Sequence, residues 1–157
     1  MKLPSLSRSI YLLYFFLIGG PLFLLATILC CLVVITASYV GLPASFISRT
    51  TGLWSKACLA VSLVRVKVRG REYLPKSDAP CVVVANHQSA FDIFVLNGHI
   101  GIPFKWVMKQ ELRDIPLVGK ACEAAQFIFV DEKSPSSIVH TIADAKKVLA
   151  TGNSIFI

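Results

Sequence analysis

The chain has 157 residues, of which 55% are hydrophobic and only 16% are charged, and its formal net charge is +7. An average globular chain carries about 25% charged residues, so the composition excludes a disordered tail, a collagen-like repeat and a solvated coiled coil. The length allows one domain with a modest core, and the excess of apolar residues indicates attachment to a membrane.

The apolar excess is concentrated near the N-terminus. Between Arg8 and Arg49 there is no charged residue and no histidine. A straight helix of about 40 residues would measure about 60 Å, twice the hydrocarbon thickness of a bilayer. We therefore expect a break at the Gly-Gly-Pro sequence of residues 19–21 and a turn at residues 41–43. Either a single span follows an interfacial helix, or the segment forms a helical hairpin. A cleaved signal peptide is disfavoured because the apolar run far exceeds the usual length.

Basic residues flank this segment on both sides. From Arg49 to Arg71 there are six basic residues and no acidic residue, which suits an anionic membrane surface. Lys2 and Arg8 favour the same side for the N-terminus. We expect both ends of the apolar segment at the cytoplasmic face of a membrane, with the bacterial inner membrane as the expected location and membrane lipids as partners.

These features divide the chain into a membrane anchor (residues 1–48), a basic linker or helix (49–63) and a folded domain (64–157). No recognised nucleic-acid-binding motif accompanies the basic charge, so we expect no nucleic-acid partner. The five cysteines include no C-x-x-C pair. We interpret them as reduced packing residues and expect no metal site.

The folded domain alternates between short apolar runs and helical patterns. We expect strands at 64–69, 81–85, 104–108, 127–130 and 154–157, and helices at 90–98, 110–113, 116–125 and 135–150. This alternation predicts an α/β fold, with a mixed or parallel sheet flanked by helices behind the N-terminal membrane helix or hairpin. Because the sequence stops inside an apolar strand, we expect a domain that is incomplete at its C-terminus, the N-terminal fragment of a longer protein.

Residues 86–92, Asn-His-Gln-Ser-Ala-Phe-Asp, follow a buried strand and open a helix. Ligands of open α/β sheets bind at the carboxyl ends of the strands. His87 and Asp92 can meet only if His87 precedes the helix and Asp92 lies on it. A carboxylate bound to one imidazole nitrogen makes the other a better base for a hydroxyl that attacks a carbonyl. The spacing of Ser89 and Asp92 equally fits a capping box, in which Asp92 only stabilises the helix start.

This H-x4-D block, behind an apolar N-terminal segment, resembles that of the glycerolipid acyltransferase family, with 1-acyl-sn-glycerol-3-phosphate acyltransferases as its nearest members. The similarity continues through residues 104–112 with their K-x-E-L turn, 115–119, 128–131 and 152–157. Two departures stand out. Gln126 lies at or near a position where the family has glycine, and Glu132 follows Asp131 where the family has I-D-R. The later F-P-E-G-T-R block is missing.

The resemblance implies acyl transfer from acyl-CoA or acyl carrier protein to the free hydroxyl of 1-acylglycerol 3-phosphate (lysophosphatidic acid). The product would be phosphatidic acid, made in phospholipid biosynthesis without a resident cofactor. His87 would be the general base and Asp92 its orienting partner. Asn86, Ser89, Lys109 and, more weakly, Lys105 are the candidate substrate-binding residues. The 157-residue chain itself is expected to be inactive. An acyltransferase for another lysolipid head group and a non-catalytic truncated membrane protein are the alternatives.

Overall fold

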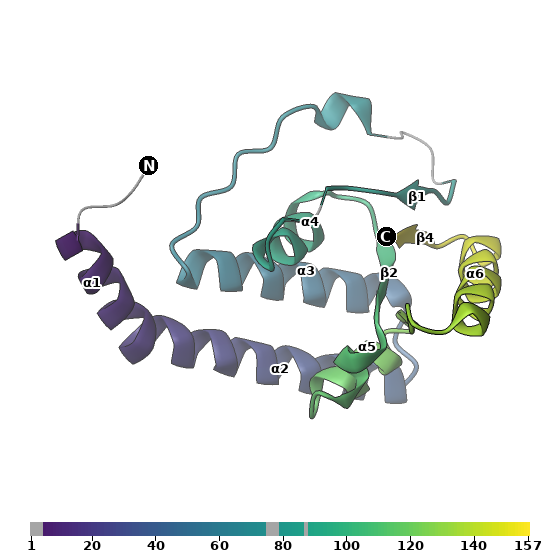
Figure 1. The fold of residues 1–157 in the computed structure, drawn as a ribbon, viewed down its shortest axis with the longest axis horizontal. Helices are drawn as coiled ribbons and strands as arrows, with labels where there is room; N and C mark the ends of the chain where they lie inside the picture. The colour runs from purple at the N-terminus through teal and green to yellow at the C-terminus, as the bar shows by residue number, and fades with distance from the viewer. Residues whose placement is uncertain (1–4, 75–78, 87) are drawn as a thin grey trace.

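The computed structural model describes residues 5–74, 79–86 and 88–157. A long N-terminal helix and its antiparallel neighbour lie beside a small parallel sheet (Figure 1). The helices are α1 (Ser5–Tyr14), α2 (Gly20–Tyr39), α3 (Ala44–Val61), α4 (Phe91–His99), α5 (Val118–Ala124) and α6 (Pro135–Ala150). The strands are β1 (Val82–Val83), β2 (Phe104–Lys109), β3 (Ile128–Val130) and β4 (Ser154–Phe156). Three short helical turns are η1 (Phe15–Gly19), η2 (Arg71–Tyr73) and η3 (Gln110–Asp114).

The N-terminal apolar segment is helical from the start of α1 to the end of α2, so the break expected at residues 19–21 is wrong. The turn η1 is π-helical, and the Gly20 N–H donates to the carbonyl of Phe15. Pro21 lies in the first turn of α2. A π-helical turn changes the hydrogen-bonding register and bends a helix without ending it, and the bend between α1 and α2 is visible in Figure 1. The resulting helix, Leu6–Tyr39, is long and apolar enough to cross a membrane.

The chain reverses after α2 instead, and α3 returns along it. At the far end of this helical hairpin, the Tyr14 hydroxyl donates to the carbonyl of Val61 at 2.8 Å. Cys31, Val34 and Ala37 of α2 are buried in one cluster with residues of α3 and α5. The hairpin therefore also forms the base of the folded domain, and the expected boundary between residues 48 and 49 falls inside α3.

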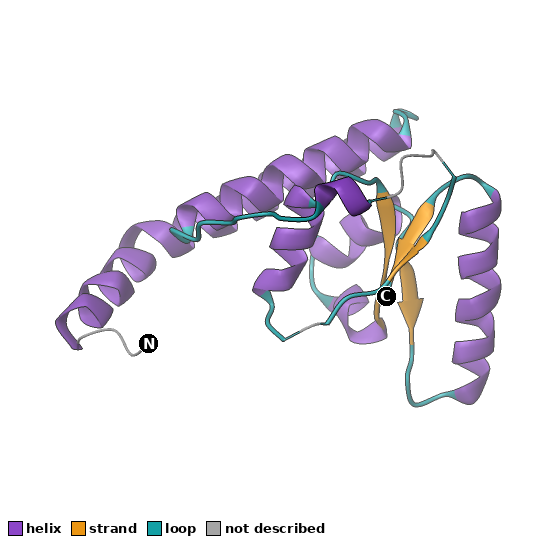
Figure 2. Cartoon of the chain, turned by 90° about the horizontal axis from the view of Figure 1, so that it is seen from above, coloured by secondary structure: helices purple, strands orange, loops and turns teal. Residues whose placement is uncertain are grey.

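All the described strand pairs are parallel, in the order β1-β4-β2-β3. Strand β4 is buried between β1 and β2, with Ile155 paired to both Val82 and Lys105. In Figure 2 the strands lie between α6 on one side and the remaining helices on the other. The expected α/β fold is thus confirmed, together with the strands at 104–108, 127–130 and 154–157, and β1 occupies the centre of the expected 81–85.

The strand expected at residues 64–69 is wrong. Residues 64–70 form an irregular segment, and the Val64 N–H donates to the carbonyl of Leu59 at the end of α3 rather than to a strand. Val68 lines a cavity together with Val95 and Leu96 of α4. Val68 therefore lies beside a helix rather than in a sheet, and the apolar–polar alternation of this segment does not identify a strand.

Close backbone packing around Gly119 explains why the Ile-Pro-Leu-Val-Gly sequence ends in a glycine. A Cβ atom at this position would lie 2.6 Å from the carbonyl carbon of Arg113 and still closer to its oxygen. Because this obstacle is backbone, we expect Gly119→Ala to lower the stability by about 1–3 kcal/mol, measured by thermal unfolding. Gly52→Ala is the matched control, since its Cβ would meet only the Asn97 carbonyl oxygen at 3.4 Å. Equal melting temperatures for Gly119→Ala and the parent would contradict the packing argument.

Candidate active site

The carboxyl ends of the four parallel strands meet at one edge of the sheet, which we call the carboxyl edge. It carries residues 84–86 and 88–90 after β1, Lys109 at the end of β2 and Asp131 and Glu132 after β3. Strand β4 separates β1 from β2, so the first two groups lie about 10 Å apart across the sheet. The described residues of the H-x4-D block, 86 and 88–92, and Lys109 thus share this edge. His87 lies outside the described residues.

Asp92 lies in the first turn of α4 and binds the turn that precedes the helix. Its Oδ2 atom accepts hydrogen bonds from the backbone N–H groups of Gln88, at 2.7 Å, and Ser89, at 2.8 Å. The Ser89 hydroxyl in turn accepts from the N–H of Phe91 at 3.2 Å. These bonds tie Asp92 to the turn in the manner of a capping box, although the N-cap residue of α4 is Ala90, which has no side-chain cap of its own. They also fix the Asp92 carboxylate against the turn that directly follows His87.

The other candidates in this loop have different surroundings. Asn86 and Ser89 are exposed, and the Ser89 hydroxyl is engaged in the cap. The N–H groups of Phe91 and Asp92 bind the hydroxyl and the carbonyl of Ser89. These two N–H groups therefore serve the turn, and they do not point to an incoming oxyanion. Among the described residues, no group of three or more His, Cys, Asp or Glu side chains is arranged to hold a metal ion.

Lys109 is exposed at the carboxyl edge and forms an ion pair that the sequence analysis missed. Its Nζ atom lies 3.3 Å from Oε2 of Glu132, which follows the neighbouring strand β3. No local signal in the sequence pointed to this pair, because it depends on β2 and β3 becoming neighbours in the sheet. Glu132 also stands where the family pattern has arginine. The cation expected beside Lys109 is thus replaced by the Glu132 carboxylate, which partly neutralises the charge of Lys109.

Lys105 is not part of this group. It lies at the opposite end of β2, four residues before Lys109 and therefore about 13 Å from it along the strand. Its side chain is buried, and its Nζ atom donates to the carbonyl of Ala125 at 2.6 Å. Burial lowers the pKa of this ammonium group. Lys105 and Lys109 therefore cannot hold the same small head group.

Comparison with known proteins identifies the family. The family profile described as Acyltransferase matches residues 65–157. Over 96% of its length the chain is 30% identical to a 1-acyl-sn-glycerol-3-phosphate acyltransferase of Chlamydomonas reinhardtii, of which it covers 44%. It is 30% identical over 99% of its length to the chloroplastic enzyme of Arabidopsis thaliana, covering 43% of that protein. It is also 34% identical over 53% of its length to the Pseudomonas aeruginosa enzyme, covering 31%.

The chain thus spans less than half the length of these curated relatives. No solved structure matches it significantly. The profile match covers more than half of the chain and includes the H-x4-D block, the Lys109 turn and all four strands of the sheet. The chain belongs to the glycerolipid acyltransferase family.

Proposed function

We propose that the protein containing this chain is an O-acyltransferase that acylates the free hydroxyl of 1-acylglycerol 3-phosphate and produces phosphatidic acid. The observation that carries the proposal is the fixed Asp92 carboxylate beside the H-x4-D turn, at the sheet edge where α/β proteins bind ligands. The names of the relatives support the choice of acceptor. The acyl donor is acyl-CoA or acyl carrier protein, and no resident cofactor is required.

In the proposed reaction His87 is the general base. The acceptor oxygen bonds to the thioester carbonyl carbon while its proton moves to the imidazole of His87. The C–S bond then breaks, and the imidazolium returns the proton to the departing thiolate. Asp92 is the positioning residue: it holds the tautomer of His87 whose free nitrogen can accept the proton, and it stabilises the imidazolium.

The N-terminal helix supports a membrane location for this reaction. Large apolar side chains along α1 and α2 are exposed, and the acceptor is an amphiphile whose acyl chain lies in the bilayer. A catalytic edge held close to the membrane surface would receive the acceptor from the lipid phase.

The direct test is acyl transfer by the full-length protein in membranes. Labelled acyl-CoA and labelled acyl carrier protein are supplied in parallel with 1-acylglycerol 3-phosphate, and phosphatidic acid is separated and quantified. We expect product with at least one donor. Folded, membrane-associated protein that forms no product with either donor would contradict the proposal and favour a non-catalytic protein.

The Lys109–Glu132 ion pair favours a second candidate, an acyltransferase for a lysolipid whose head group carries a positive charge. Glu132 offsets the cation that would bind a phosphate monoester, and it could itself bind an ammonium group. Lysophospholipids with choline or ethanolamine head groups, assayed beside 1-acylglycerol 3-phosphate, discriminate between the two candidates. A higher kcat/KM for either zwitterionic acceptor would support the second one.

Opposite effects are expected when the two members of this ion pair are changed one at a time. Lys109→Met should raise the KM for 1-acylglycerol 3-phosphate about tenfold, because a charge-assisted hydrogen bond to phosphate is lost, and leave the KM for the donor unchanged. Glu132→Gln should lower the acceptor KM, because Lys109 is released. Lys147→Met, which breaks the exposed pair with Asp144 on α6, is the control. Equal acceptor KM values in Lys109→Met and this control would exclude Lys109 from phosphate binding.

A further inference from the structure

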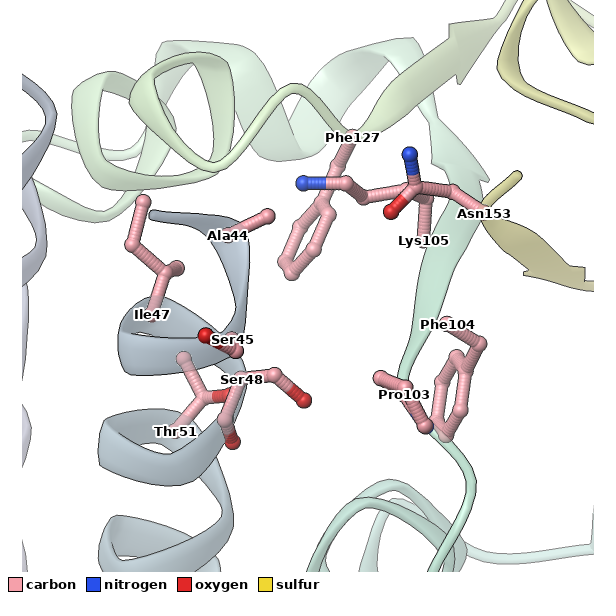
Figure 3. Close-up of a pocket in the computed structure, with 10 residues that line it drawn as sticks. All are labelled: Ala44, Ser45, Ile47, Ser48, Thr51, Pro103, Phe104, Lys105, Phe127 and Asn153. Carbon is pink, nitrogen blue, oxygen red and sulfur yellow. Dashed lines mark hydrogen bonds between the residues drawn. The ribbon is translucent and has the colours of Figure 1, made fainter. Parts of the chain in front are cut away.

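A pocket opens at the amino edge of the sheet, the opposite edge from the candidate active site (Figure 3). Its volume is about 170 Å³, and it lies between the first turns of α3 and the start of β2. In Figure 3 Ser45, Ser48 and Thr51 form one wall, while the Lys105 side chain extends from β2 across the pocket toward Ala44. Nothing in the proposed reaction uses these residues.

Lys105 gives this pocket an unbalanced positive charge. Only 6% of the residue is exposed, and the one hydrogen bond described for its ammonium group goes to the neutral Ala125 carbonyl. None of the described residues lining the pocket is acidic. Burial lowers the pKa of Lys105. Buried lysines are almost always paired with an opposite charge, so an anion in the pocket would supply the missing partner.

Further hydrogen-bond donors surround the same space. Ser45 and Ser48 lie three residues apart on the face of α3 that lines the pocket, and Thr51 continues this face, with its hydroxyl already donating to the Ser48 carbonyl at 3.1 Å. The first turn of α3 has no side-chain cap, since its N-cap residue is Pro43, and uncapped N–H groups at a helix start favour negative charge. These groups would bind the oxygen atoms of a phosphate, which accepts several hydrogen bonds at once.

A second groove continues the pocket along α3. It has a volume of about 590 Å³, shares Ser45 and Ser48 with the pocket, and is lined by Arg49 and Lys56. Its described lining residues also include no carboxylate. The pocket and the groove together therefore present three cations and no anion, a charge distribution that excludes a cationic ligand and suits one with net negative charge.

An apolar groove lies on the other side of the same bend. It has a volume of about 290 Å³ and is lined mainly by apolar residues from the end of α2 to the start of α3, among them Val33, Val40, Leu42 and Phe46. Phe46 directly follows Ser45, and the residue is 41% exposed. At the bend of the hairpin, residues 40–46, the apolar groove and the pocket are therefore lined by the successive residues Phe46 and Ser45. An inorganic ion would not require an apolar groove beside its site, but a lipid would use it.

We propose that the bend of the α2–α3 hairpin is a binding site for an anionic phospholipid. The lipid phosphate binds Lys105 and the hydroxyl groups of α3, the rest of the head group faces Arg49, and an acyl chain lies along the groove that ends at Phe46. The site lies at the amino edge of the sheet, so it is separate from the carboxyl edge and independent of the proposed reaction. Such a lipid would hold the folded domain at a defined depth and orientation on the membrane.

The test measures lipid retention rather than catalysis. The purified protein is released from mild detergent in native mass spectrometry after incubation with phosphatidylglycerol, phosphatidylcholine or diacylglycerol. We expect phosphatidylglycerol to bind about tenfold more tightly than either of the lipids without net charge. A tenfold difference in Kd is about the effect expected of one additional charge-assisted hydrogen bond. Lys105→Met should remove this preference, Lys105→Arg should keep it, and Lys146→Met on α6 should not change it.

Other results would overturn the proposal. These are equal retention of the three lipids by the parent protein, unchanged selectivity in folded Lys105→Met, or displacement of phosphatidylglycerol by millimolar inorganic phosphate. The last result would indicate a site for free phosphate. If Lys105→Met does not fold, Arg49→Gln decides in its place, because Arg49 is exposed and its loss should lower the phosphatidylglycerol preference about threefold. Unchanged selectivity in that variant would equally reject the site.

Discussion

Replacing His87 by alanine is expected to lower the rate of acyl transfer about 10²–10⁴-fold, which corresponds to roughly 3–5 kcal/mol of activation free energy. The proposed reaction requires a base for the acceptor hydroxyl, and alanine cannot accept the proton. Because the substitution does not alter the groups proposed to bind the lipid acceptor, the loss should appear in kcat more than in KM. The measurement is steady-state transfer from labelled donor by full-length protein in membranes.

A matched control separates this effect from a general loss of protein. His140→Ala removes an exposed histidine on α6 and should leave the rate unchanged. Both variants must reach the membrane in equal amounts and retain the melting temperature of the parent. If His87→Ala meets these conditions and still transfers acyl groups within tenfold of the parent rate, another residue is the base.

The second large effect is expected at Asp92, where two substitutions distinguish catalysis from capping. An asparagine side chain keeps an oxygen that can accept from the N–H groups of Gln88 and Ser89. Asp92→Asn should therefore fold almost normally, yet lose about 10²–10⁴-fold in rate, because an amide holds the imidazole in the wrong tautomer and cannot stabilise the imidazolium. Asp92→Ala should lose the rate and also about 1–2 kcal/mol of stability, since the capping bonds disappear.

The comparison of these two variants is decisive for the role of Asp92. If the carboxylate only caps α4, activity should follow stability, and Asp92→Asn should remain nearly as active as the parent. If the carboxylate positions His87, the double variant His87→Ala, Asp92→Asn should lose little more than His87→Ala alone, because residues that act as one unit are not additive. Additive losses would indicate separate roles.

Local signals explain which elements could be predicted from the sequence. Helix α6 begins and ends at the expected residues, because Ser134 caps it, Pro135 occupies its first turn and a glycine follows it. The start of α4 follows similarly from Ser89 and Asp92. The wrong expectations came from sequence patterns that are compatible with two different structures. A Gly-Gly-Pro sequence breaks a helix or bends it through a π turn, and alternating valines cover a strand or a helix.

Only those features of the candidate site that involve residues close together in the sequence could be predicted. The capping geometry of Asp92 lies within a few residues, and its spacing indicated it. The pairing of Lys109 with Glu132 depends on which strands become adjacent, and that is a property of the whole sheet. The expected strand at 104–108 already separated Lys105 from Lys109, but the burial of Lys105 and its bond to the Ala125 carbonyl depend on long-range packing.

The central position of β4 has a consequence for how the chain folds. Its backbone joins β1 to β2, and the contact between Cys81 and Ser154 spans 73 residues of sequence. Contacts of such long range form slowly, because loop closure must precede any gain from pairing. During synthesis the inner edges of β1 and β2 stay unpaired until the residues of β4 have been made. The α2–α3 hairpin, by contrast, can form before that point. Unpaired edges invite pairing with other chains. The inner edges of β1 and β2 are therefore open to such pairing until β4 is in place, even after the hairpin has formed.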